Sequence, residues 1–550
     1  MKIALAQLNY HIGNFSANKE QIIDHIQEAR GLGAELIIFS ELAVCGYYPN
    51  DLLERREFIG RCVETITEIA SHCFGIAALV GGPSINKSPN GKMLFNSAYF
   101  LKEGKIESVH SKTLLPTYDI FDEYRHFEPN HEFNLIELNG VRLAVTICED
   151  LWFNQPVLSA FGREKLYSLC PVEEYCKQNP DLVINLSASP FSYNQEKFRK
   201  QIVLDNAKNY AVPIIYVNQI GAQTELIFDG GSMFIDQYGN VIEEMAYFKP
   251  DFAIIDTNNI PVNPKLQPET ETIEKIYAAL VLGIRDYFKK NGFKKATLGL
   301  SGGIDSAVTL VLAERALGAE NIRVLLMPSK FSSEHSVEDA IALADNLDIS
   351  YDIIKIHQIV EEFDVTLAPV FNSLPHDIAE ENIQARVRGT LLMGLSNKFG
   401  HILLNTSNKS EMAVGYGTLY GDMNGGLSVL GDVYKTDVFK LARFINKDKE
   451  IIPVNTINKP PSAELRPGQK DSDSLPDYEV LDKILFDYIE LAKSPSEIIA
   501  SGYDEETVHR TILMVNRTEY KRFQAPPILR VSSKAFGFGR KMPLVAKYAL

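Results

Sequence analysis

The sequence contains no Cys-x-x-Cys pair, and only 6 of its 550 residues are cysteine. Zinc-binding and dithiol redox sites commonly use such pairs, so the sequence indicates neither kind of site. All six cysteines fall in the first third of the chain, and a disulfide framework would be unusual for a chain of this length. We therefore expect most of them to be small buried side chains, with Cys148 as an exception that its sequence context singles out.

Long apolar runs, low-complexity stretches and fixed-period repeats are also missing. The first absence argues against a membrane-spanning helix, and the last against a solenoid or propeller. The first residues lead into a strand-like pattern rather than a charged segment followed by a long apolar one, so no signal peptide is expected. Basic residues are outnumbered, 55 against 71 acidic ones, and a net charge of −16 repels nucleic acid and anionic membranes. We expect a soluble, cytoplasmic protein without nucleic-acid or membrane partners.

The hydrophobic pattern divides the chain into two parts, and 45% hydrophobic residues in a chain of 550 can fill two cores. The first half alternates strand-like and helix-like segments, as is typical of α/β proteins. Three prolines between residues 260 and 268 predict an extended linker. We assign residues 1–262 to a first domain, 263–272 to a linker and 273–550 to a second domain. The predicted strands are residues 3–8, 36–39, 77–81, 143–147, 182–186, 214–217 and 296–300, and the predicted helices include 18–30 and 273–288.

Three residues of the first domain together suit thiol-dependent hydrolysis. Glu41 and Cys148 each follow a predicted strand, and ligands commonly bind at strand ends in α/β sheets. A thiol needs a base or a nearby cation to act as a nucleophile at neutral pH. Glu41 could accept its proton, and Lys112 could stabilise the oxyanion that forms when the thiolate attacks a carbonyl. Each residue alone is better explained by packing or by a solvated charge, so the prediction depends on the combination.

The contexts of these three residues resemble the Glu–Lys–Cys triad of the nitrilase-like amidohydrolases, over residues 1 to about 260. The resemblance includes residues 112–118 and 121–127. It implies an α-β-β-α sandwich, with Glu123 as a second glutamate that orients Lys112 or the substrate. The implied chemistry is thioester formation at Cys148, release of ammonia, and attack by water that Glu41 activates.

The resemblance narrows to the glutaminase domains of glutamine-dependent NAD synthetases. In that family Tyr118 and Ser189 would contact glutamine. The family often has a lysine shortly after that serine, where this chain has Gln195. The implied glutamine contacts are therefore Tyr118, Glu123, Ser189 and Gln195.

A glycine-rich turn in the second domain predicts a phosphate-binding loop between a short strand and an apolar helix. Glycines let the backbone approach an oxyanion, while Ser301, Ser306 and the free amides at the helix start can donate to phosphate. The Walker A lysine is missing, and Asp305 is instead placed to hold Mg²⁺ bound to pyrophosphate. A tight helix start without a ligand is the alternative interpretation. The loop comprises Gly299, Leu300, Ser301, Gly302, Gly303, Ile304, Asp305 and Ser306.

The combination Ser-Gly-Gly-x-Asp-Ser after a strand resembles the pyrophosphate loop of the N-type ATP pyrophosphatases, which activate an acid by adenylation. This implies a Rossmann-like, doubly wound parallel sheet. Residues 381–388, 405–411, 431–436 and 519–522 further resemble NAD synthetases. That resemblance implies ATP contacts from the loop and Thr406, and Mg²⁺ ligands Asp305 and Glu411. The implied contacts with deamido-NAD are Asn382, Glu411, Asp422, Lys435 and Lys521.

Three hypotheses follow. In the first, glutamine supplies ammonia and ATP adenylates deamido-NAD, which ammonia converts to NAD. The second keeps both activities but changes the acid that accepts ammonia. The third is a nucleotide-binding scaffold with a vestigial amidase domain and no catalysis. The resemblance favours the first and implies a homo-oligomer built from dimers of the synthetase domain.

Overall fold

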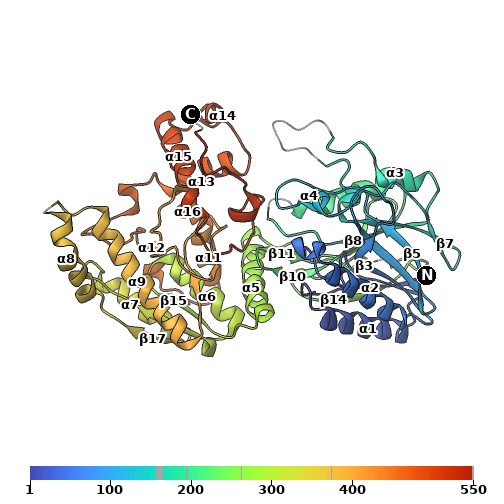
Figure 1. The fold of residues 1–550 in the computed structure, drawn as a ribbon, viewed down its shortest axis with the longest axis horizontal. Helices are drawn as coiled ribbons and strands as arrows, with labels where there is room; N and C mark the ends of the chain where they lie inside the picture. The colour runs from blue at the N-terminus through green and yellow to red at the C-terminus, as the bar shows by residue number, and fades with distance from the viewer. Residues whose placement is uncertain (156–164, 194–195, 262, 373, 548–550) are drawn as a thin grey trace. The chain divides into compact units, whose positions relative to one another are not determined.

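The computed structural model spans the 550-residue chain and describes residues 1–155, 165–193, 196–261, 263–372 and 374–547. The chain divides into two compact units, Met1–Glu269 and Thr270–Leu550 (Figure 1). In the described residues no helix is both long enough and apolar enough to cross a membrane.

The first unit contains two six-stranded sheets and a short hairpin. The first sheet has the order β14-β1-β2-β3-β4-β5 and the second β13-β12-β9-β8-β7-β6. The first sheet consists of β1 (Lys2–Gln7), β2 (Leu36–Ile38), β3 (Ala77–Ile85), β4 (Leu94–Lys102), β5 (Lys105–Ser111) and β14 (Asp251–Asp256). The second consists of β6 (Ile136–Leu138), β7 (Val141–Ile147), β8 (Leu182–Ser187), β9 (Ile214–Asn218), β12 (Met233–Ile235) and β13 (Val241–Glu244), and the hairpin of β10 (Ile220–Gln223) and β11 (Leu226–Asp229).

These two sheets pack face to face between two layers of helices. One core joins them and contains Ile3 and Leu5 of the first sheet and Ile184 and Leu186 of the second. The opposite face of the first sheet is covered by α1 (Phe15–Gly31) and α2 (Arg56–Ala70), and that of the second by α3 (Pro171–Cys176) and α4 (Glu196–Tyr210) (Figure 1). The result is the α-β-β-α sandwich that the resemblance implied, stabilised by apolar surface buried in three layers.

The second unit is built on a five-stranded sheet of order β17-β16-β15-β18-β19, in which every pairing is parallel. The order reverses between β15 and β18, so this is a doubly wound sheet whose ligand crevice is expected at the carboxyl ends of those strands. Its strands are β15 (Ala296–Gly299), β16 (Ile322–Leu326), β17 (Ser350–Ile353), β18 (Ile402–Asn405) and β19 (Leu427–Ser428). Its helices include α5 (Thr272–Asn291), α6 (Ile304–Leu317), α7 (Glu334–Asn346), α8 (His357–Phe371), α9 (Ile378–Phe399), α10 (Lys409–Val414), α11 (Lys435–Ile445), α12 (Val454–Asn458), α13 (Tyr478–Ile489), α14 (Pro495–Ala500), α15 (Glu505–Arg517) and α16 (Glu519–Arg522).

The predicted strands coincide with β1, β2, β3, β7, β8, β9 and β15, and the two predicted helices lie within α1 and α5. Those strands are apolar and almost wholly buried, which made their sequences distinctive. The antiparallel strands at the sheet edges were not predicted. One of them, β5, has mostly exposed or half-buried side chains, so it lacks a continuous apolar run.

Candidate active sites

A buried group of three charges lies in the first unit. The ammonium of Lys112 is 2.8 Å from Glu41 Oε1 and 2.8 Å from Glu123 Oε1. The three side chains are 0–1% exposed. Both carboxylates raise the pKa of the lysine above its ordinary value, against the opposing effect of burial. The resemblance implied that Glu123 orients Lys112 or the substrate, and the fold places Glu123 and Glu41 on the same ammonium.

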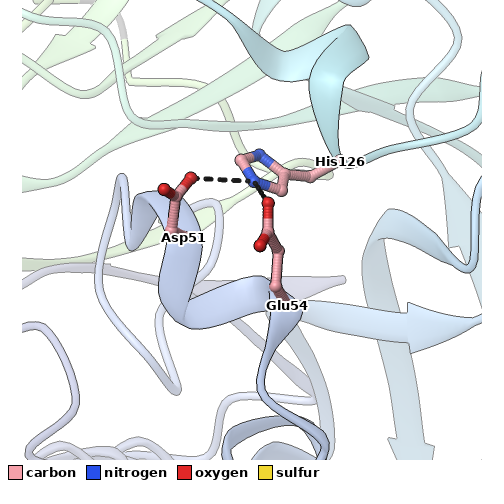
Figure 2. A group of neighbouring side chains, drawn as sticks. All are labelled: Asp51, Glu54 and His126. Carbon is pink, nitrogen blue, oxygen red and sulfur yellow. Dashed lines mark ion pairs between the residues drawn. The ribbon is translucent and has the colours of Figure 1, made fainter.

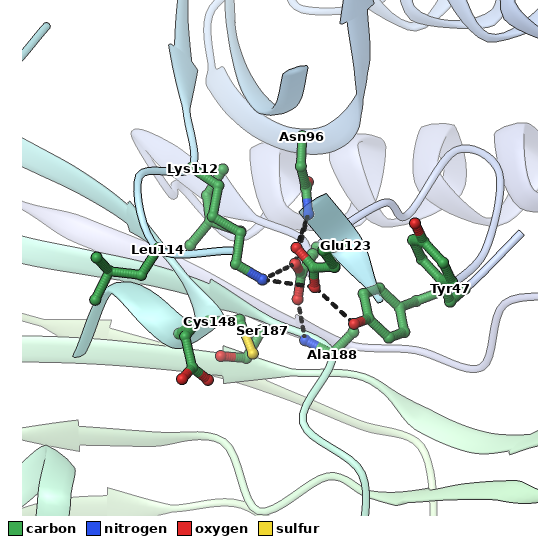
Figure 3. Close-up of polar contacts among 12 residues, drawn as sticks. Tyr47, Asn96, Lys112, Leu114, Glu123, Cys148, Ser187 and Ala188 are labelled. Atoms are coloured by element: carbon green, nitrogen blue, oxygen red, sulfur yellow. Dashed lines mark hydrogen bonds and ion pairs between the residues drawn. The ribbon is translucent and has the colours of Figure 1, made fainter. Parts of the chain in front are cut away.

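Other polar groups fix the two carboxylates. Asn96 Nδ2 donates to Glu41 Oε1 at 2.7 Å, and the backbone N–H of Ala188 donates to Glu41 Oε2 at 2.9 Å. The hydroxyl of Tyr47 donates to Glu123 Oε1 at 2.6 Å. These donors come from different segments and limit the rotation of each carboxylate (Figure 3).

Glu41 is also placed by a close contact between backbones. A Cβ atom at Gly81 would lie 2.3 Å from the carbonyl oxygen of Ser40 and 2.4 Å from the amide nitrogen of Leu42. Glycine alone fits here, because any side chain would push the segment carrying Glu41 away from β3.

Cys148 lies beside this ion group, directly after β7 (Figure 3). Its φ of +42° is unfavourable for a residue with a side chain and marks an imposed turn from strand into the 3₁₀ helix Cys148–Leu151. Burial raises the pKa of the thiol well above its ordinary value; Glu41 raises it further, whereas Lys112 lowers it. The resting group is therefore a neutral thiol, and attack on a carbonyl requires a base to take its proton.

Asp150 holds the turn at Cys148 against the segment that carries Lys112. Its carboxylate accepts from the backbone N–H groups of Thr113 at 3.0 Å, Leu114 at 2.8 Å and Ile147 at 2.9 Å. Burial raises the pKa of Asp150 to about 7 in spite of these three donors. One side chain thus connects the residue before Cys148 to the two residues after Lys112.

Another buried carboxylate, Glu149, directly follows Cys148 in the sequence. It accepts from the hydroxyl of Tyr118 at 2.9 Å, the hydroxyl of Tyr167 at 2.8 Å and Nε2 of Gln155 at 3.0 Å. Burial raises its pKa to about 7. Tyr118 was predicted from the sequence and Glu149 was overlooked, although its position directly after Cys148 could have drawn attention to it.

Two further residues, Ser189 and Gln195, were predicted from the resemblance to contact glutamine. Ser189 follows β8; its backbone N–H donates to Asn218 Oδ1 at 2.9 Å, and its carbonyl accepts from Asn218 Nδ2 at 3.2 Å. Its position is thus fixed by an amide from the neighbouring strand. Gln195 lies outside the described residues.

The second unit has a cavity of about 320 Å³ at the carboxyl ends of β15 and β18. Residues predicted from the sequence supply much of its wall. They are Gly299, Leu300, Ser301, Gly303, Ile304, Asp305, Ser306, Thr406, Glu411, Asp422 and Lys435. The fold therefore gathers the predicted phosphate loop and the more distant motifs around one cavity.

The predicted phosphate loop, residues 299–306, has at Gly302 a glycine backbone conformation that leaves no room for a side chain. Gly302 has a φ of +81°, and a Cβ there would lie 2.1 Å from the carbonyl oxygen of Ser336. Ser306 Oγ donates to the carbonyl of Gly303 at 2.9 Å, and Ser301 Oγ accepts from the N–H of Gly303 at 3.2 Å. Since α6 begins at Ile304, its first amides lie directly behind this turn.

Acidic groups gather around a lysine at one side of the cavity. Lys435 Nζ lies 2.5 Å from Asp305 Oδ2 and 3.2 Å from Glu411 Oε1. Burial raises the pKa of Glu411 to about 8, with Asp305 and Asp471 adding repulsion and Lys435 opposing it. Asp471, which was not predicted, also lines the cavity and accepts from the hydroxyl of Tyr478 at 3.0 Å.

The other predicted contacts support a turn at the cavity wall. Asn382 Oδ1 accepts from the hydroxyl of Thr418 at 2.6 Å, and Asp422 Oδ1 accepts from the backbone N–H of the same threonine at 2.7 Å. Lys521 Nζ donates to the carbonyls of Gly415 at 2.8 Å and Gly417 at 2.7 Å. Burial raises the pKa of Asp422 to about 6.

Two cations of the cavity wall, Arg388 and Lys459, were not predicted. Arg388 Nε donates to the carbonyl of Met327 at 3.1 Å, and Lys459 Nζ lies 2.9 Å from Asp339 Oδ2. Arg388 is inside a segment already recognised, residues 381–388, whereas Lys459 has no motif around it that could have identified it.

Comparison with known proteins matches both units to families. Residues 2–258 match the carbon–nitrogen hydrolase family, and residues 276–525 match the NAD synthase family. The glutamine-dependent NAD(+) synthetase of Synechocystis sp. is 45% identical over 99% of both chains. That of Acinetobacter baylyi is 43% identical over 99% of this chain and 98% of its own.

Two solved structures are also similar to this chain. The glutamine-dependent NAD+ synthetase of Acinetobacter baumannii, determined with adenosine diphosphate, is 40% identical, covers 99% of this chain and 98% of its own, and gives a TM-score of 0.78. The enzyme of Cytophaga hutchinsonii shares the fold, with a TM-score of 0.84 at 20% identity, and covers 100% of this chain and 98% of its own. The chain therefore belongs to the glutamine-dependent NAD(+) synthetases, ligases in which a carbon–nitrogen hydrolase domain is joined to an NAD synthase domain.

Proposed function

We propose that Cys148 attacks the side-chain amide of glutamine in the first unit. Glu41 takes the thiol proton and passes it to the leaving nitrogen, so that the C–N bond breaks and ammonia departs from a thioester. Lys112 stabilises the oxyanion, and Glu123 with Tyr47 holds that lysine in place. Water deprotonated by Glu41 then releases glutamate. The observation that carries this proposal is the buried contact of Lys112 with both carboxylates beside Cys148.

Glutamine would be recognised by groups around the nucleophile. Tyr118 and Ser189 are the proposed contacts, together with Glu123 and with Gln195. Glu149 adds a buried carboxylate whose donors, in the described part of the chain, are two hydroxyls and an amide rather than a cation. We assign it to the α-ammonium of glutamine, because a buried carboxylate held by neutral donors favours a positively charged ligand.

In the second unit the proposed reaction is adenylation of deamido-NAD. An oxygen of its nicotinate carboxylate attacks the α-phosphorus of ATP and pyrophosphate leaves; ammonia then attacks the carbonyl carbon and AMP leaves. Activation is needed because a carboxylate is a poor acceptor of an amine. The phosphate loop and Thr406 would bind ATP through N–H and hydroxyl donors. Asn382, Glu411, Asp422, Lys435 and Lys521 would position deamido-NAD.

Magnesium fits the acidic side of this cavity. Asp305, Glu411 and Asp471 supply three carboxylates around the ammonium of Lys435, and hard oxygen ligands are those that Mg²⁺ prefers. We propose that Asp305 and Glu411 hold the ion. When bound, it would neutralise phosphate charge on ATP. Lys435 would offset the repulsion between these carboxylates and contact phosphate oxygens.

These assignments give residues 1–262 the glutaminase activity and residues 273–550 the synthetase activity, with 263–272 as linker. The decisive experiment supplies ATP and deamido-NAD to the full chain and compares glutamine with ammonium as the nitrogen source. We expect NAD and AMP from both, and glutamate from glutamine alone. Formation of AMP with another acid but not with deamido-NAD would instead support the hypothesis of a different acceptor, and no turnover at all would support the scaffold.

A homo-oligomer is also proposed, on the basis of helix α8. None of the residues of α8 is fully buried. Two of its apolar side chains are largely exposed, Val365 at 69% and Val370 at 75%. Apolar side chains on one helix commonly mark a surface that another subunit covers. Light scattering is expected to give a multiple of the chain mass, and a Val365→Glu, Val370→Glu double variant is expected to lower it.

We place the reaction in the cytoplasm, because its proposed nucleophile is a thiol that must stay reduced and its co-substrate is ATP. The six cysteines are all free.

A further inference from the structure

Two carboxylates and one imidazole converge at a place that the reaction does not use. Asp51 and Glu54 belong to the 3₁₀ helix Asn50–Glu54, and His126 follows the 3₁₀ helix Glu123–Arg125 (Figure 2). His126 Nε2 lies 3.5 Å from Asp51 Oδ1 and 3.7 Å from Glu54 Oε1. One ligand atom from each residue lies within 4.8 Å of the other two.

These separations suit three ligands of one small cation. Two ligand atoms bound at about 2.05 Å and at the tetrahedral angle lie roughly 3.3 Å apart. The two distances from His126 Nε2 exceed this by only a few tenths of an ångström. Small rotations of the two carboxylates, which are exposed, would bring them into range.

The imidazole supplies an independent sign of a ligand. The side chain of His126 is 6% exposed, whereas those of Asp51 and Glu54 are 66% and 56% exposed. Its Nε2 atom is buried and makes no hydrogen bond within the part of the chain that the structure describes. It nevertheless points toward the two carboxylates (Figure 2). A buried polar atom without a hydrogen bond is unfavourable. A cation bound between Nε2 and the two carboxylates would give this nitrogen a partner.

The other ring nitrogen has a partner of the kind found behind metal-bound histidines. His126 Nδ1 is 2.7 Å from the hydroxyl of Tyr48, and that hydroxyl lies 3.5 Å from the carbonyl oxygen of Asp122, to which it donates. When Nδ1–H donates to the tyrosine oxygen, Nε2 keeps its lone pair. Such outer partners fix the tautomer and direction of a histidine ligand.

Arg125 also forms ion pairs with the carboxylates of Asp51 and Glu54. Its Nη2 lies 3.0 Å from Asp51 Oδ1 and 3.4 Å from Glu54 Oε1, and its side chain is 51% exposed. The guanidinium can therefore leave toward solvent when a stronger ligand for the carboxylates arrives. Arg125 also provides a test, because its guanidinium and a metal ion would compete for the same two carboxylates.

We propose that Asp51, Glu54 and His126 form a binding site for a divalent cation of the zinc type, separate from the proposed magnesium site. One imidazole nitrogen with two carboxylate oxygens is a donor set that Zn²⁺ accepts, with water completing the coordination. Mg²⁺ is a poorer fit, because it binds oxygen ligands in preference to imidazole.

The site would tie together two segments that reach the glutaminase centre. Tyr47 precedes the Asn50–Glu54 helix, and Glu123 begins the helix before His126. The hydroxyl of Tyr47 donates to Glu123 at 2.6 Å. A bound ion would thus brace the same two segments at a second point, on the outer side of Glu123.

Binding is tested on the metal-free, full-length protein by equilibrium dialysis against Zn²⁺, with Co²⁺ absorption as a second readout. The wild type is expected to bind one equivalent more than Asp51→Asn and His126→Gln. Because Asp51 is exposed, its variant should fold even if the buried histidine cannot be replaced. His335→Gln is the matched control: His335 Nδ1 lies 3.5 Å from Glu338 Oε2, but its side chain is 80% exposed, and it should leave the stoichiometry unchanged.

Two further variants sharpen the outcome. Tyr48→Phe should weaken the site by about ten-fold, because the histidine loses the partner that directs it. Arg125→Ala should tighten binding, since it removes the competing guanidinium. Equal stoichiometry in the wild type and Asp51→Asn, or binding to Arg125→Ala that is no tighter than to the wild type, would overturn the proposal. The cluster would then be a surface ion pair of Arg125.

Discussion

The ammonium of Lys112 lies 2.8 Å from Glu123, 11 positions later in the chain, and both side chains are removed from solvent. This contact explains how a lysine can remain charged inside an apolar sandwich: Glu41 and Glu123 together favour its protonated form. It also separates two roles for the carboxylates. Glu41 touches the lysine and a backbone N–H, and is proposed as the base, while Glu123 is proposed to position the lysine.

Replacing Cys148, the proposed nucleophile, should separate the two activities. Cys148→Ala is expected to abolish glutamine-driven NAD formation and to leave ammonium-driven formation near the wild-type rate, because the second unit contains its own cavity. Cys176→Ala, at a half-buried thiol, is the control and should keep both. Rates are measured as NAD formed with each nitrogen source. Equal loss of both rates in Cys148→Ala would contradict the division of labour.

Removing the charge of Glu123 should impair hydrolysis and weaken glutamine binding, because Glu123 is proposed both to position Lys112 and to contact glutamine. In Glu123→Gln, Glu41 is the only one of the two carboxylates that still pairs with Lys112. The ion pair between Lys112 and Glu41 then becomes tighter, which makes Glu41 a poorer base. We expect kcat for glutamine hydrolysis to fall by about 100-fold, together with a rise in KM. Glu128→Gln serves as the control, since Glu128 instead accepts from the backbone N–H of Lys92. A rise in KM with kcat unchanged would contradict the positioning role and leave Glu123 as a substrate contact only.

Glutamine binding should weaken as the pH falls through 7. Burial raises the pKa of Glu149 to about 7, so the carboxylate that would bind the α-ammonium is ionised above that pH and protonated below it. At one pH unit below the pKa only about a tenth of it is charged, and Kd should rise accordingly. Calorimetry with Cys148→Ala avoids turnover during the measurement. Adding Glu149→Gln should raise Kd at pH 8 and flatten its pH dependence; an unchanged slope would exclude Glu149.

The phosphate loop should not tolerate a side chain at Gly302. Gly302→Ala places a methyl group 2.1 Å from the carbonyl oxygen of Ser336, at a φ of +81° that disfavours any side chain. Gly303→Ala is the matched control, since its φ is −80° and its Cβ approaches only Ser301 Oγ, at 3.3 Å. NAD formation from either nitrogen source should be lost in Gly302→Ala and far less affected in Gly303→Ala. Similar losses of NAD formation in the two variants would mean that the activity does not depend on the backbone conformation at Gly302.

Asp305 should be needed for magnesium-dependent binding of ATP. Asp305→Asn removes a charge from the proposed ion site and from Lys435, whose ammonium lies 2.5 Å away. We expect ATP affinity in the presence of Mg²⁺ to fall by about 10- to 100-fold, with synthesis lost for both nitrogen sources. Asp437→Asn, which alters a carboxylate paired with Lys440, is the control. If binding without Mg²⁺ falls as much as binding with it, Asp305 is not an ion ligand.

Prediction from the sequence worked best where chemistry and local structure coincide. The turn around Gly302 needs a positive φ, two hydroxyls and a helix start within a few residues, and the residue types that supply them are consecutive in the chain. Likewise β7 is a short apolar run, so the residue order alone places Cys148 at the end of a strand. Such features depend on steric limits and on hydrophobic periodicity, which act between near neighbours.

Contacts between distant segments could not be predicted in this way. Asn96 reaches Glu41 across 55 positions, and Tyr47 reaches Glu123 across 76. No local pattern distinguishes this asparagine or this tyrosine from others in the chain. The same holds for His126, whose neighbours Asp51 and Glu54 come from a helix more than 70 positions earlier.

The sequence by itself determined which residues are proposed as the nucleophile, its two charged companions and the phosphate loop, and it determined the alternation of strands and helices, because each depends on residue type and short-range geometry. Only the tertiary structure decided which donors fix those charges and that Glu149 faces hydroxyls. It also decided that three acids surround Lys435 and that a buried imidazole faces two surface carboxylates. The physical reason is that hydrogen bonds and ion pairs act over a few ångströms, and strand pairing and sheet packing set which distant residues come that close.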